Sequence, residues 1–258
     1  MKYDAVILAG GENTSNLRKI APYRNEALIK IGKYPMIYYV YRALRQSASI
    51  RTIVISGPVE ALKTIFPKEE KLLFAGGGEN AITSFSNAID VLQQYGISDR
   101  ILVMPTDIPL ITTPAIDDFI RRSEEIEADF YYSITTKEIN DIKFPGVSRT
   151  YVKLKEGTFT GGNLFMVNRQ VINKVLDMAL KLVMRRKNPL AMARLFGLNL
   201  VIRYITRQLS IEAAEKRFQE VVGIKGKAII SPYAEVGIDV DKPSDLQLAQ
   251  KHLLDICS

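Results

Sequence analysis

The sequence contains very little cysteine and histidine. Its 258 residues include one of each, Cys257 and His252. A single cysteine excludes a disulfide within the chain and a cysteine metal cluster, which agrees with a reducing compartment. A lone histidine in the last helical pattern is typical of a surface position, so Ser–His or Cys–His nucleophilic catalysis has little support.

Two nucleotide-binding motifs and a leader pattern are also missing. The chain has neither the GxxxxGK[ST] pattern of P-loop ATPases nor the GxGxxG pattern of classical dehydrogenases, so both classes are disfavoured. The N-terminus has no basic stretch followed by a long apolar run, so we expect no secretory signal and a cytoplasmic protein. With 47% hydrophobic and 24% charged residues, the composition is that of a globular protein with a full core.

The positive charge is unevenly distributed. Residues 181–227 hold eleven Lys or Arg against three Glu, whereas the rest of the chain carries 24 basic and 25 acidic residues. This segment is either the solvated face of helices or a surface for an anionic partner. Its only aromatic residues are Phe196, Tyr204 and Phe218, which are more simply explained as core residues, so we expect no nucleic-acid partner. Its mixture of basic and apolar residues leaves a peripheral membrane contact open, and the sequence also leaves a homodimer open.

Within this segment, residues 190–208 form an apolar stretch of transmembrane length. Arg194 and Arg203 interrupt it, and each would cost about 2.5–3.5 kcal/mol at a bilayer centre. We therefore expect a helical pair that packs on the domain or against a partner.

Short apolar runs alternate with amphipathic patterns along the first 135 residues. Strands are expected at 5–8, 52–56, 71–75, 101–104 and 130–134, and helices at 35–46, 59–66, 80–95 and after a cap at Thr113. Later strands are expected at 164–167, 227–230 and 235–240, and later helices at 170–186, 210–222 and from 243. The pattern between about 137 and 160 indicates loops and a short antiparallel piece. This alternation predicts an α/β fold with a mostly parallel, Rossmann-like twisted sheet and helices on both faces.

Glycines follow three of the expected strands. The apolar run at 5–8 ends at Gly10 and Gly11, and further clusters lie at 76–78 and 161–162. A strand followed by an ordinary turn would explain any one of them. Three in an α/β chain favour a nucleotide site, because bare backbone N–H groups bind phosphates at the carboxyl end of strands.

One aspartate directly follows a buried strand. Asp107 is expected to project into the crevice where open α/β sheets bind ligands, and one carboxylate there suits Mg²⁺. Asp239 and Asp241 are the candidates for a second carboxylate, and we expect only one of them to face Asp107. Alternatively, Asp107 caps a turn and Asp241 caps the helix that begins near Pro243.

Five blocks of the sequence resemble, in order, those of the nucleotidyltransferases built on a glycosyltransferase-A-like (GT-A-like) fold. This group includes molybdenum-cofactor guanylyltransferase, the methylerythritol-phosphate cytidylyltransferase and the sugar-phosphate nucleotidyltransferases. The blocks are AVILAGG at 5–11, ALIKIGKYPMIYYV at 27–40, Gly77-Gly78 with Ser84-Phe85, MPTDIPL at 104–110 and DVDKPSDL at 239–246. The resemblance covers about residues 4–135 and 226–254.

The resemblance implies a GT-A-like sheet with a helical insertion. We expect one nucleotidyltransferase domain over residues 1–258. Its segment from about 137 to 225 is partly helical and matches none of the blocks. In this family, the corresponding region shapes the acceptor site.

The resemblance also implies a reaction. A Mg²⁺-dependent enzyme would transfer an NMP from a nucleoside triphosphate to a phosphorylated small-molecule or lipid acceptor and release pyrophosphate. Such chemistry needs positioning and charge neutralisation more than a protein nucleophile.

The resemblance also implies roles for particular residues. The implied catalytic residues are Arg18, Asp107 and Asp239, and the implied metal ligands are Asp107, Asp239 and Asp241. The implied nucleotide-binding residues are Leu8, Ala9, Gly10, Gly11, Lys30, Gly77, Gly78, Asn80 and Ser84. The implied acceptor-binding residues are Gly162 and Asn163.

The chain departs from the family pattern in one loop. The family carries an arginine soon after the glycines, a role open to Arg18, and then a lysine for the phosphates. At the lysine position stands Glu26, and the candidates to replace that lysine from nearby are Arg24, Lys30 and Lys33. The leading hypothesis is therefore a nucleotidyltransferase, and the alternative is a non-catalytic nucleotide- or partner-binding protein on the same fold.

Overall fold

The structure is a computed structural model that describes residues 2–13, 15–67, 69–185 and 197–254. Cys257 lies outside this description, as do the parts of the two expected helical stretches, 170–186 and 190–208, that fall on residues 186–196. The strands are β1 (Tyr3–Leu8), β2 (Lys30–Ile31), β3 (Tyr34–Pro35), β4 (Ile50–Gly57), β5 (Leu72–Gly76), β6 (Arg100–Pro105), β7 (Phe130–Thr136), β8 (Val152–Leu154), β9 (Gly157–Asn168) and β10 (Gly226–Ser231). The α-helices are α1 (Ser15–Arg18), α2 (Met36–Gln46), α3 (Val59–Ile65), α4 (Ala81–Tyr95), α5 (Thr113–Glu124), α6 (Lys137–Lys143), α7 (Ile172–Arg185), α9 (Leu198–Ile205), α10 (Ile211–Val222) and α11 (Pro243–Leu254). Three short 3₁₀ helices are η1 (Glu26–Leu28), η2 (Arg169–Val171) and η3 (Ala234–Gly237).

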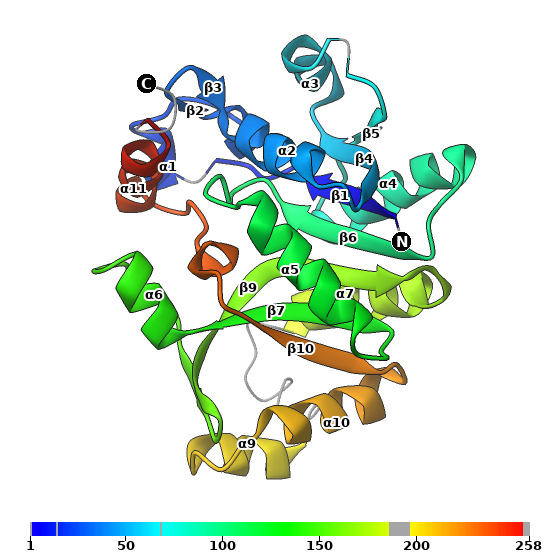
Figure 1. Ribbon diagram of the computed structural model, residues 1–258, viewed down its shortest axis with the longest axis vertical. Coiled ribbons are helices and arrows are strands. Elements are labelled where there is room, and N and C mark those ends of the chain that lie inside the picture. The colour runs from blue at the N-terminus through cyan, green and yellow to red at the C-terminus, as the bar shows by residue number, and fades with distance from the viewer. Residues whose placement is uncertain (1, 14, 68, 186–196, 255–258) are drawn as a thin grey trace.

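One mixed sheet organises the molecule (Figure 1). Its strand order is β10-β7-β9-β6-β1-β4-β5, with β8 paired to β9 outside this path. β1 lies between β4 and β6 and runs parallel to both, so Val6 is in register with Val54 and Val103. β9 runs antiparallel to β6 and β7. The expected mostly parallel α/β sheet is confirmed, with β9 as an antiparallel member inside it.

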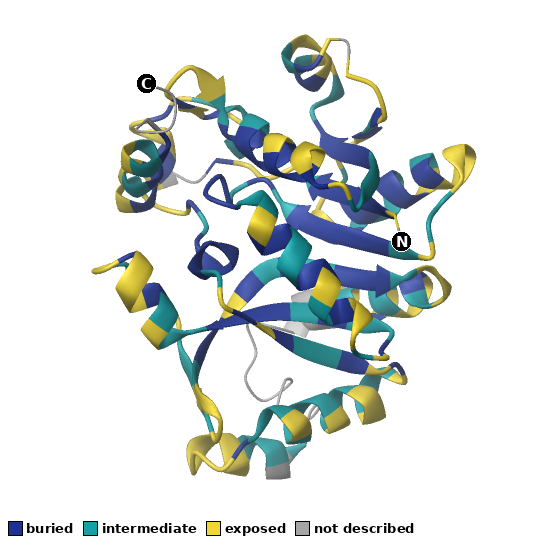
Figure 2. Ribbon diagram, viewed as in Figure 1, coloured by how far each residue is buried: buried dark blue, intermediate teal, exposed yellow. Residues whose placement is uncertain are grey.

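Both faces of the sheet are covered, as the apolar run of β1 predicts. Ala5 and Ile7 are buried in the core cluster that includes Ile37 of α2 and Phe119 of α5. Val6 is buried in a separate cluster on the other face, with residues of α4 and α7. Figure 2 shows the central strands as buried and the outer sides of the helices as exposed. A strand buried on both faces needs a continuous apolar run rather than an alternating one.

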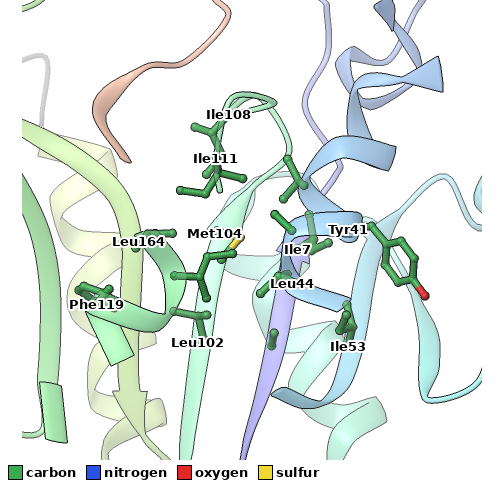
Figure 3. Close-up of a cluster of buried hydrophobic side chains, with 14 of the residues drawn as sticks. Ile7, Tyr41, Leu44, Ile53, Leu102, Met104, Ile108, Ile111, Phe119 and Leu164 are labelled. Carbon is green, nitrogen blue, oxygen red and sulfur yellow. The ribbon is translucent and has the colours of Figure 1, made fainter. Parts of the chain in front are cut away.

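The loop after β6 is fixed by the core beneath it. Ile108 and Ile111 are buried and project from this loop toward Met104 and Leu164, as Figure 3 shows. A third apolar cluster joins Leu110 of the same loop to Val240 and to residues of α1 and α11. The chain segments that follow β6 and η3 are therefore held together at the carboxyl edge of the sheet.

Three local expectations were wrong. Residues 235–240 form η3 and an extended segment, not a strand. The cap of α5 is Thr112, whose hydroxyl accepts a hydrogen bond from the Ala115 N–H, because the helix begins one residue earlier than expected. Residues 137–143 form the helix α6 rather than a loop. The short antiparallel piece is confirmed as β8 paired with β9.

The apolar stretch at 190–208 is described only in part, as α9. Among the described residues, none of the helices has the length and apolar run needed to cross a membrane.

Candidate active site

A cavity of about 420 Å³ lies at the carboxyl end of β1. Leu8, Gly10 and Gly11 line one wall, and Asn80 and Ser84 from the start of α4 line another. An ideal Cβ on Gly10 would lie 3.2 Å from the Ser84 hydroxyl oxygen. The missing side chain at Gly10 therefore lets the two walls approach each other and leaves backbone exposed to the cavity.

The second glycine cluster supports the first turn of α4. The Gly78 N–H donates a 2.9 Å hydrogen bond to the Ser84 hydroxyl. The Asn80 side chain caps the helix by accepting hydrogen bonds from the N–H groups of Ile82 (2.9 Å) and Thr83 (3.1 Å). An ideal Cβ on Gly78 would lie 2.7 Å from the Ser84 backbone nitrogen, so this position has no room for a side chain.

The structure separates the expected nucleotide-binding residues into two groups. Those that line the cavity are Leu8, Gly10, Gly11, Asn80 and Ser84. Ala9, Gly77 and Gly78 lie next to it as supporting backbone: Ala9 is fully buried, and the Gly77 N–H donates to the Gly57 carbonyl oxygen. Lys30 on β2 and Arg18 at the end of α1 are exposed, and neither is among the described residues that line the cavity.

Asp107 lies at the far side of the same cavity, in the turn after β6. Its backbone is held from both directions, because the Thr106 N–H donates to the Leu8 carbonyl oxygen at 3.1 Å and the Asp107 carbonyl oxygen accepts from Val240 N–H at 2.8 Å. Its carboxylate oxygen Oδ1 is buried and has no hydrogen-bond partner among the described residues. A buried unpaired carboxylate oxygen is costly, so it indicates a position prepared for a ligand.

The structure brings all three expected metal ligands together. Asp107, Asp239 and Asp241 each offer a carboxylate oxygen, and these atoms lie within 4.8 Å of one another. The expectation that only one of Asp239 and Asp241 faces Asp107 is therefore wrong. Residues two apart on extended backbone point to the same side, and the segment is extended here.

Burial and the crowding of negative charge raise the pKa values of this cluster. Burial, followed by the charges of Asp239, Glu26 and Asp241, raises the pKa of Asp107 to about 7. Burial and then Asp241 and Asp239 raise the pKa of Glu26 to about 7. The pKa of Asp241 is raised by burial and by its neighbour Asp239. The pKa values are raised partly because the ionised carboxylates repel one another. A bound cation would relieve that repulsion, so the cluster is suited to bind one.

Arg149 balances part of this charge. Its Nη1 forms an ion pair with the Asp239 carboxylate, and its Nη2 donates a 2.7 Å hydrogen bond to the Asp239 carbonyl oxygen. Only 10% of the Arg149 side chain is exposed, and its Nε is buried with no partner among the described residues. The two contacts fix both the backbone and the side chain of Asp239.

A second cavity, of about 470 Å³, opens on the other side of the carboxylates. It is lined by Asp239 and Asp241 and also by the expected acceptor residues Gly162 and Asn163. Asn163 is held by a 3.1 Å hydrogen bond from its Nδ2 to the Val236 carbonyl oxygen. An ideal Cβ on Gly162 would lie 2.8 Å from the Ser133 carbonyl oxygen, so glycine is needed for β9 to pack this closely against β7.

Sequence reasoning missed the remaining polar residues of the second cavity. These are Tyr132, Ser148, Arg149, Thr150, Thr160, Lys242 and Asp245. Most lie in the segment 137–225, where no block of the sequence resembled a family pattern. The sequence offered one signal for Arg149 as a site residue, since it is the sole arginine between Arg122 and Arg169.

The contacts of Arg149 predict the effect of its replacement. We expect Arg149→Lys to weaken the binding of a divalent cation by the three carboxylates about 10- to 100-fold, because lysine keeps the charge but not the two-pronged contact with Asp239. A titration with Mn²⁺ followed by electron paramagnetic resonance measures this. Arg121→Lys, on the exposed side of α5, is the matched control. An unchanged Mn²⁺ affinity in Arg149→Lys would contradict the positioning role.

The raised pKa of Asp107 predicts a pH effect on stability in metal-free protein. Its pKa is about 7 in the folded chain and about 3.9 when unfolded. The folded state therefore binds more protons between these values, and its stability falls as the pH rises from about 4 to about 7. We expect Asp107→Asn to raise the free energy of unfolding at pH 8 by on the order of 2–3 kcal/mol and to give no gain at pH 4. Urea unfolding with a chelator present measures this, and an equal effect at both pH values would contradict it.

The fold and the two cavities together indicate a class of protein. Two cavities meet at three carboxylates on the carboxyl edge of a mostly parallel sheet, the edge at which open α/β sheets bind ligands. Such an arrangement suits a transferase, because a transferase must bring two substrates together. The family model described as the MobA-like NTP transferase domain matches residues 5–194, and the chain belongs to that family.

Solved structures agree with this assignment. The chain is 33% identical to a hypothetical transferase from Thermus thermophilus, with a TM-score of 0.80 over 95% of this chain and 100% of that chain. CMP:2-keto-3-deoxy-manno-octonic acid synthetase, complexed with CTP, is 13% identical with a TM-score of 0.63 over 99% and 100% of the two chains. The 4-diphosphocytidyl-2C-methyl-D-erythritol synthase from Anaerococcus prevotii is 14% identical with a TM-score of 0.59 over 98% and 96%. These last two likenesses concern the fold. No curated protein sequence matches the chain significantly.

The expected GT-A-like nucleotidyltransferase fold, the family and the enzyme class are thus confirmed.

Proposed function

We propose that the protein transfers an NMP from a nucleoside triphosphate to a phosphorylated acceptor, with Mg²⁺ as its cofactor and pyrophosphate as the second product. One observation carries the proposal. Asp107 lines the cavity at the glycine turn, Asp239 and Asp241 line the second cavity, and the three carboxylates lie within 4.8 Å. The carboxylates therefore stand where a triphosphate in one cavity would meet an acceptor in the other.

The donor set fits Mg²⁺. The cluster offers hard carboxylate oxygens from Asp107, Asp239 and Asp241, and Mg²⁺ prefers such oxygens together with phosphate and water. The unpaired buried Oδ1 of Asp107 supports the same assignment. When bound, the ion would neutralise negative charge on the reacting phosphates.

The protein's own residues place the two substrates. The backbone of Gly10 and Gly11 and the first turn of α4 bind the nucleotide, and the CTP-bound relative supports a triphosphate as its occupant. Gly162 and Asn163 form one wall for the acceptor. An oxygen of the acceptor phosphate forms the new bond to the α-phosphorus, the bond from that phosphorus to the β-phosphate oxygen breaks, and pyrophosphate leaves.

The segment 137–225 shapes the acceptor side in this proposal, within one nucleotidyltransferase domain. Ser148, Arg149 and Thr150 line the second cavity together with the glycines of β9. This lining is rich in hydroxyl and charged groups, which suits the polar and phosphorylated part of an acceptor.

An apolar groove favours an acceptor with an apolar portion, as in a lipid phosphate. The groove, of about 340 Å³, lies between β7, β10 and α10 and is lined by Phe130 and Phe218. Tyr132 lines both this groove and the acceptor cavity. A chain attached to a phosphate in the cavity would therefore have an apolar surface next to it.

The exposed side of α9 supports a peripheral contact with an anionic membrane surface. Ile202, Tyr204 and Ile205 are exposed, and Arg203 and Arg207 lie beside them in the sequence. Exposed apolar side chains with interspersed arginines suit the interface of an anionic bilayer. Flotation with phosphatidylglycerol vesicles at low salt tests this. Wild type should float and Arg203→Glu with Arg207→Glu should not, whereas equal flotation of both would overturn the contact.

Pyrophosphate release tests the proposed reaction. Wild-type protein should release pyrophosphate from one of the four common nucleoside triphosphates when Mg²⁺ and a phosphorylated acceptor are both present. The acceptor panel should include sugar phosphates, polyol phosphates and polyprenyl phosphates. Nucleotide binding that is unaffected by Asp107→Ala, together with no release from any pair, would instead favour the non-catalytic alternative.

A further inference from the structure

The cavity assigned to the nucleotide is unusually acidic. Four of its lining residues are Glu12, Glu26, Glu79 and Asp107, and none of the described lining residues is Lys or Arg. A nucleoside triphosphate adds several negative charges to this cavity. Like charges at short range repel strongly in a partly buried site, so positive charge must enter with the nucleotide.

Neither Arg18 nor Arg24 of the loop before Glu26 is among the described residues that line this cavity. Arg24 meets the cavity only through Glu12, with which it is paired at 3.9 Å, and 86% of its side chain is exposed. Arg18 is also exposed. The position at which the sequence resemblance places a phosphate-binding lysine is occupied by Glu26.

Glu26 is held firmly at the cavity wall. Its N–H donates a 3.1 Å hydrogen bond to the Gly11 carbonyl oxygen, and its own carbonyl oxygen accepts from Ile29 N–H at 3.0 Å. Its carboxylate lies against the glycine turn, since an ideal Cβ on Gly11 would be 2.6 Å from Glu26 Oε2. These backbone hydrogen bonds fix the position of Glu26. Its carboxylate has no hydrogen bond or ion pair with any described residue, so both carboxylate oxygens are available to a ligand.

We propose that Glu26 is a ligand for a second divalent cation that binds together with the triphosphate. The inference rests on the proposed function, since it assumes a triphosphate in this cavity and one ion at Asp107, Asp239 and Asp241. Two features point to the ligand: the available carboxylate of Glu26 and the buried, unpaired Oδ1 of Asp107 in the same cavity. The second ion supplies the positive charge that a lysine would supply, and it takes its remaining ligands from phosphate and water.

Counting bound Mn²⁺ by electron paramagnetic resonance tests this proposal. The protein is saturated with an α,β-methylene nucleoside triphosphate, and protein-bound Mn²⁺ is counted per bound nucleotide. Wild type should hold about two ions, whereas Glu26→Gln and Glu26→Lys should hold about one. Glu79→Gln removes another carboxylate of the same cavity and is the matched control, which should keep two. Glu26→Lys should also retain nucleotide affinity at low Mn²⁺, because the lysine replaces the ion.

The outcomes separate this proposal from the reaction itself. One Mn²⁺ per nucleotide in a wild-type protein that still releases pyrophosphate would overturn the role of Glu26 and leave the proposed function standing. If Glu26→Gln still holds two ions and Arg24→Ala loses nucleotide affinity, the role of Glu26 is overturned and Arg24 is the residue that compensates the charge of the triphosphate. Failure of the wild type to bind any nucleotide with Mn²⁺ would overturn both.

Discussion

Asp107→Asn is expected to abolish turnover. Asparagine keeps the shape of the side chain, and the backbone contacts of residue 107 to Val240 and of Thr106 to Leu8 are unaffected. The substitution removes the negative charge at the point where the two cavities meet. Because the proposed reaction depends on charge neutralisation in place of a protein nucleophile, we expect kcat/KM to fall by about 10³-fold or more.

Two controls accompany this substitution. Asp99→Asn changes a carboxylate whose side chain is 95% exposed and should leave activity unchanged. The free energy of unfolding of Asp107→Asn should equal or exceed that of wild type at neutral pH, so lost activity cannot be attributed to unfolding. Activity within tenfold of wild type in a fully folded Asp107→Asn protein would contradict the assigned role of Asp107.

Gly57→Ala is expected to damage both stability and nucleotide binding. An ideal Cβ on Gly57 would lie 2.7 Å from the Ala9 carbonyl oxygen. Ala9 cannot move freely, because it is held by two hydrogen bonds. Its N–H donates to the Ser56 carbonyl oxygen at 2.7 Å, and its own carbonyl oxygen accepts from Asn25 Nδ2 at 2.8 Å. We expect a loss of about 1–3 kcal/mol in the free energy of unfolding and weaker triphosphate binding, because the displaced residue precedes Gly10.

Gly76→Ala is the matched control for Gly57→Ala. Gly76 lies directly opposite Gly57 in the register of β4 and β5, and an ideal Cβ there has nothing within 4 Å. Its stability and nucleotide affinity should match those of wild type. Denaturant unfolding and calorimetric titration with the nucleotide measure both quantities, and similar losses in the two variants would contradict the close-approach explanation.

The sheet and its glycine turn could be predicted from the sequence because buried parallel strands leave a strong local signal. The run at 5–8 is apolar on both faces and ends at Gly10, and Asp107 directly follows the apolar run of β6. Positions of this kind can be predicted because they are determined by residues that are neighbours in the sequence. The crevice at the carboxyl edge then follows from general properties of α/β sheets.

The segment around Asp239 shows where this reasoning fails. Apolar and acidic residues alternate there, with Val236, Ile238 and Val240 buried, and such alternation predicts a strand. The structure explains the alternation differently, because Ile238 and Val240 of the extended segment are buried in the apolar cluster with α1 and α11, outside the sheet. The periodicity therefore identified the extended backbone that follows η3, but it missed the 3₁₀ helix itself and wrongly predicted pairing in the sheet.

Arg149 and α6 left weaker signals. Arg149 reaches Asp239 across ninety positions of sequence, and no local pattern encodes a contact of that separation. The short helix α6 exposes 83% of Ile142, so its apolar residues do not mark a buried face. Tertiary packing, rather than local propensity, determines both features.

The most direct test of the central claim is a crystal structure with Mn²⁺ and a non-hydrolysable nucleoside triphosphate, using anomalous scattering to locate the ion. The account predicts an anomalous peak at Asp107, Asp239 and Asp241, with the triphosphate in the cavity between Gly10 and the first turn of α4. A nucleotide seated elsewhere, or a bound nucleotide with no Mn²⁺ at the three carboxylates, would contradict it.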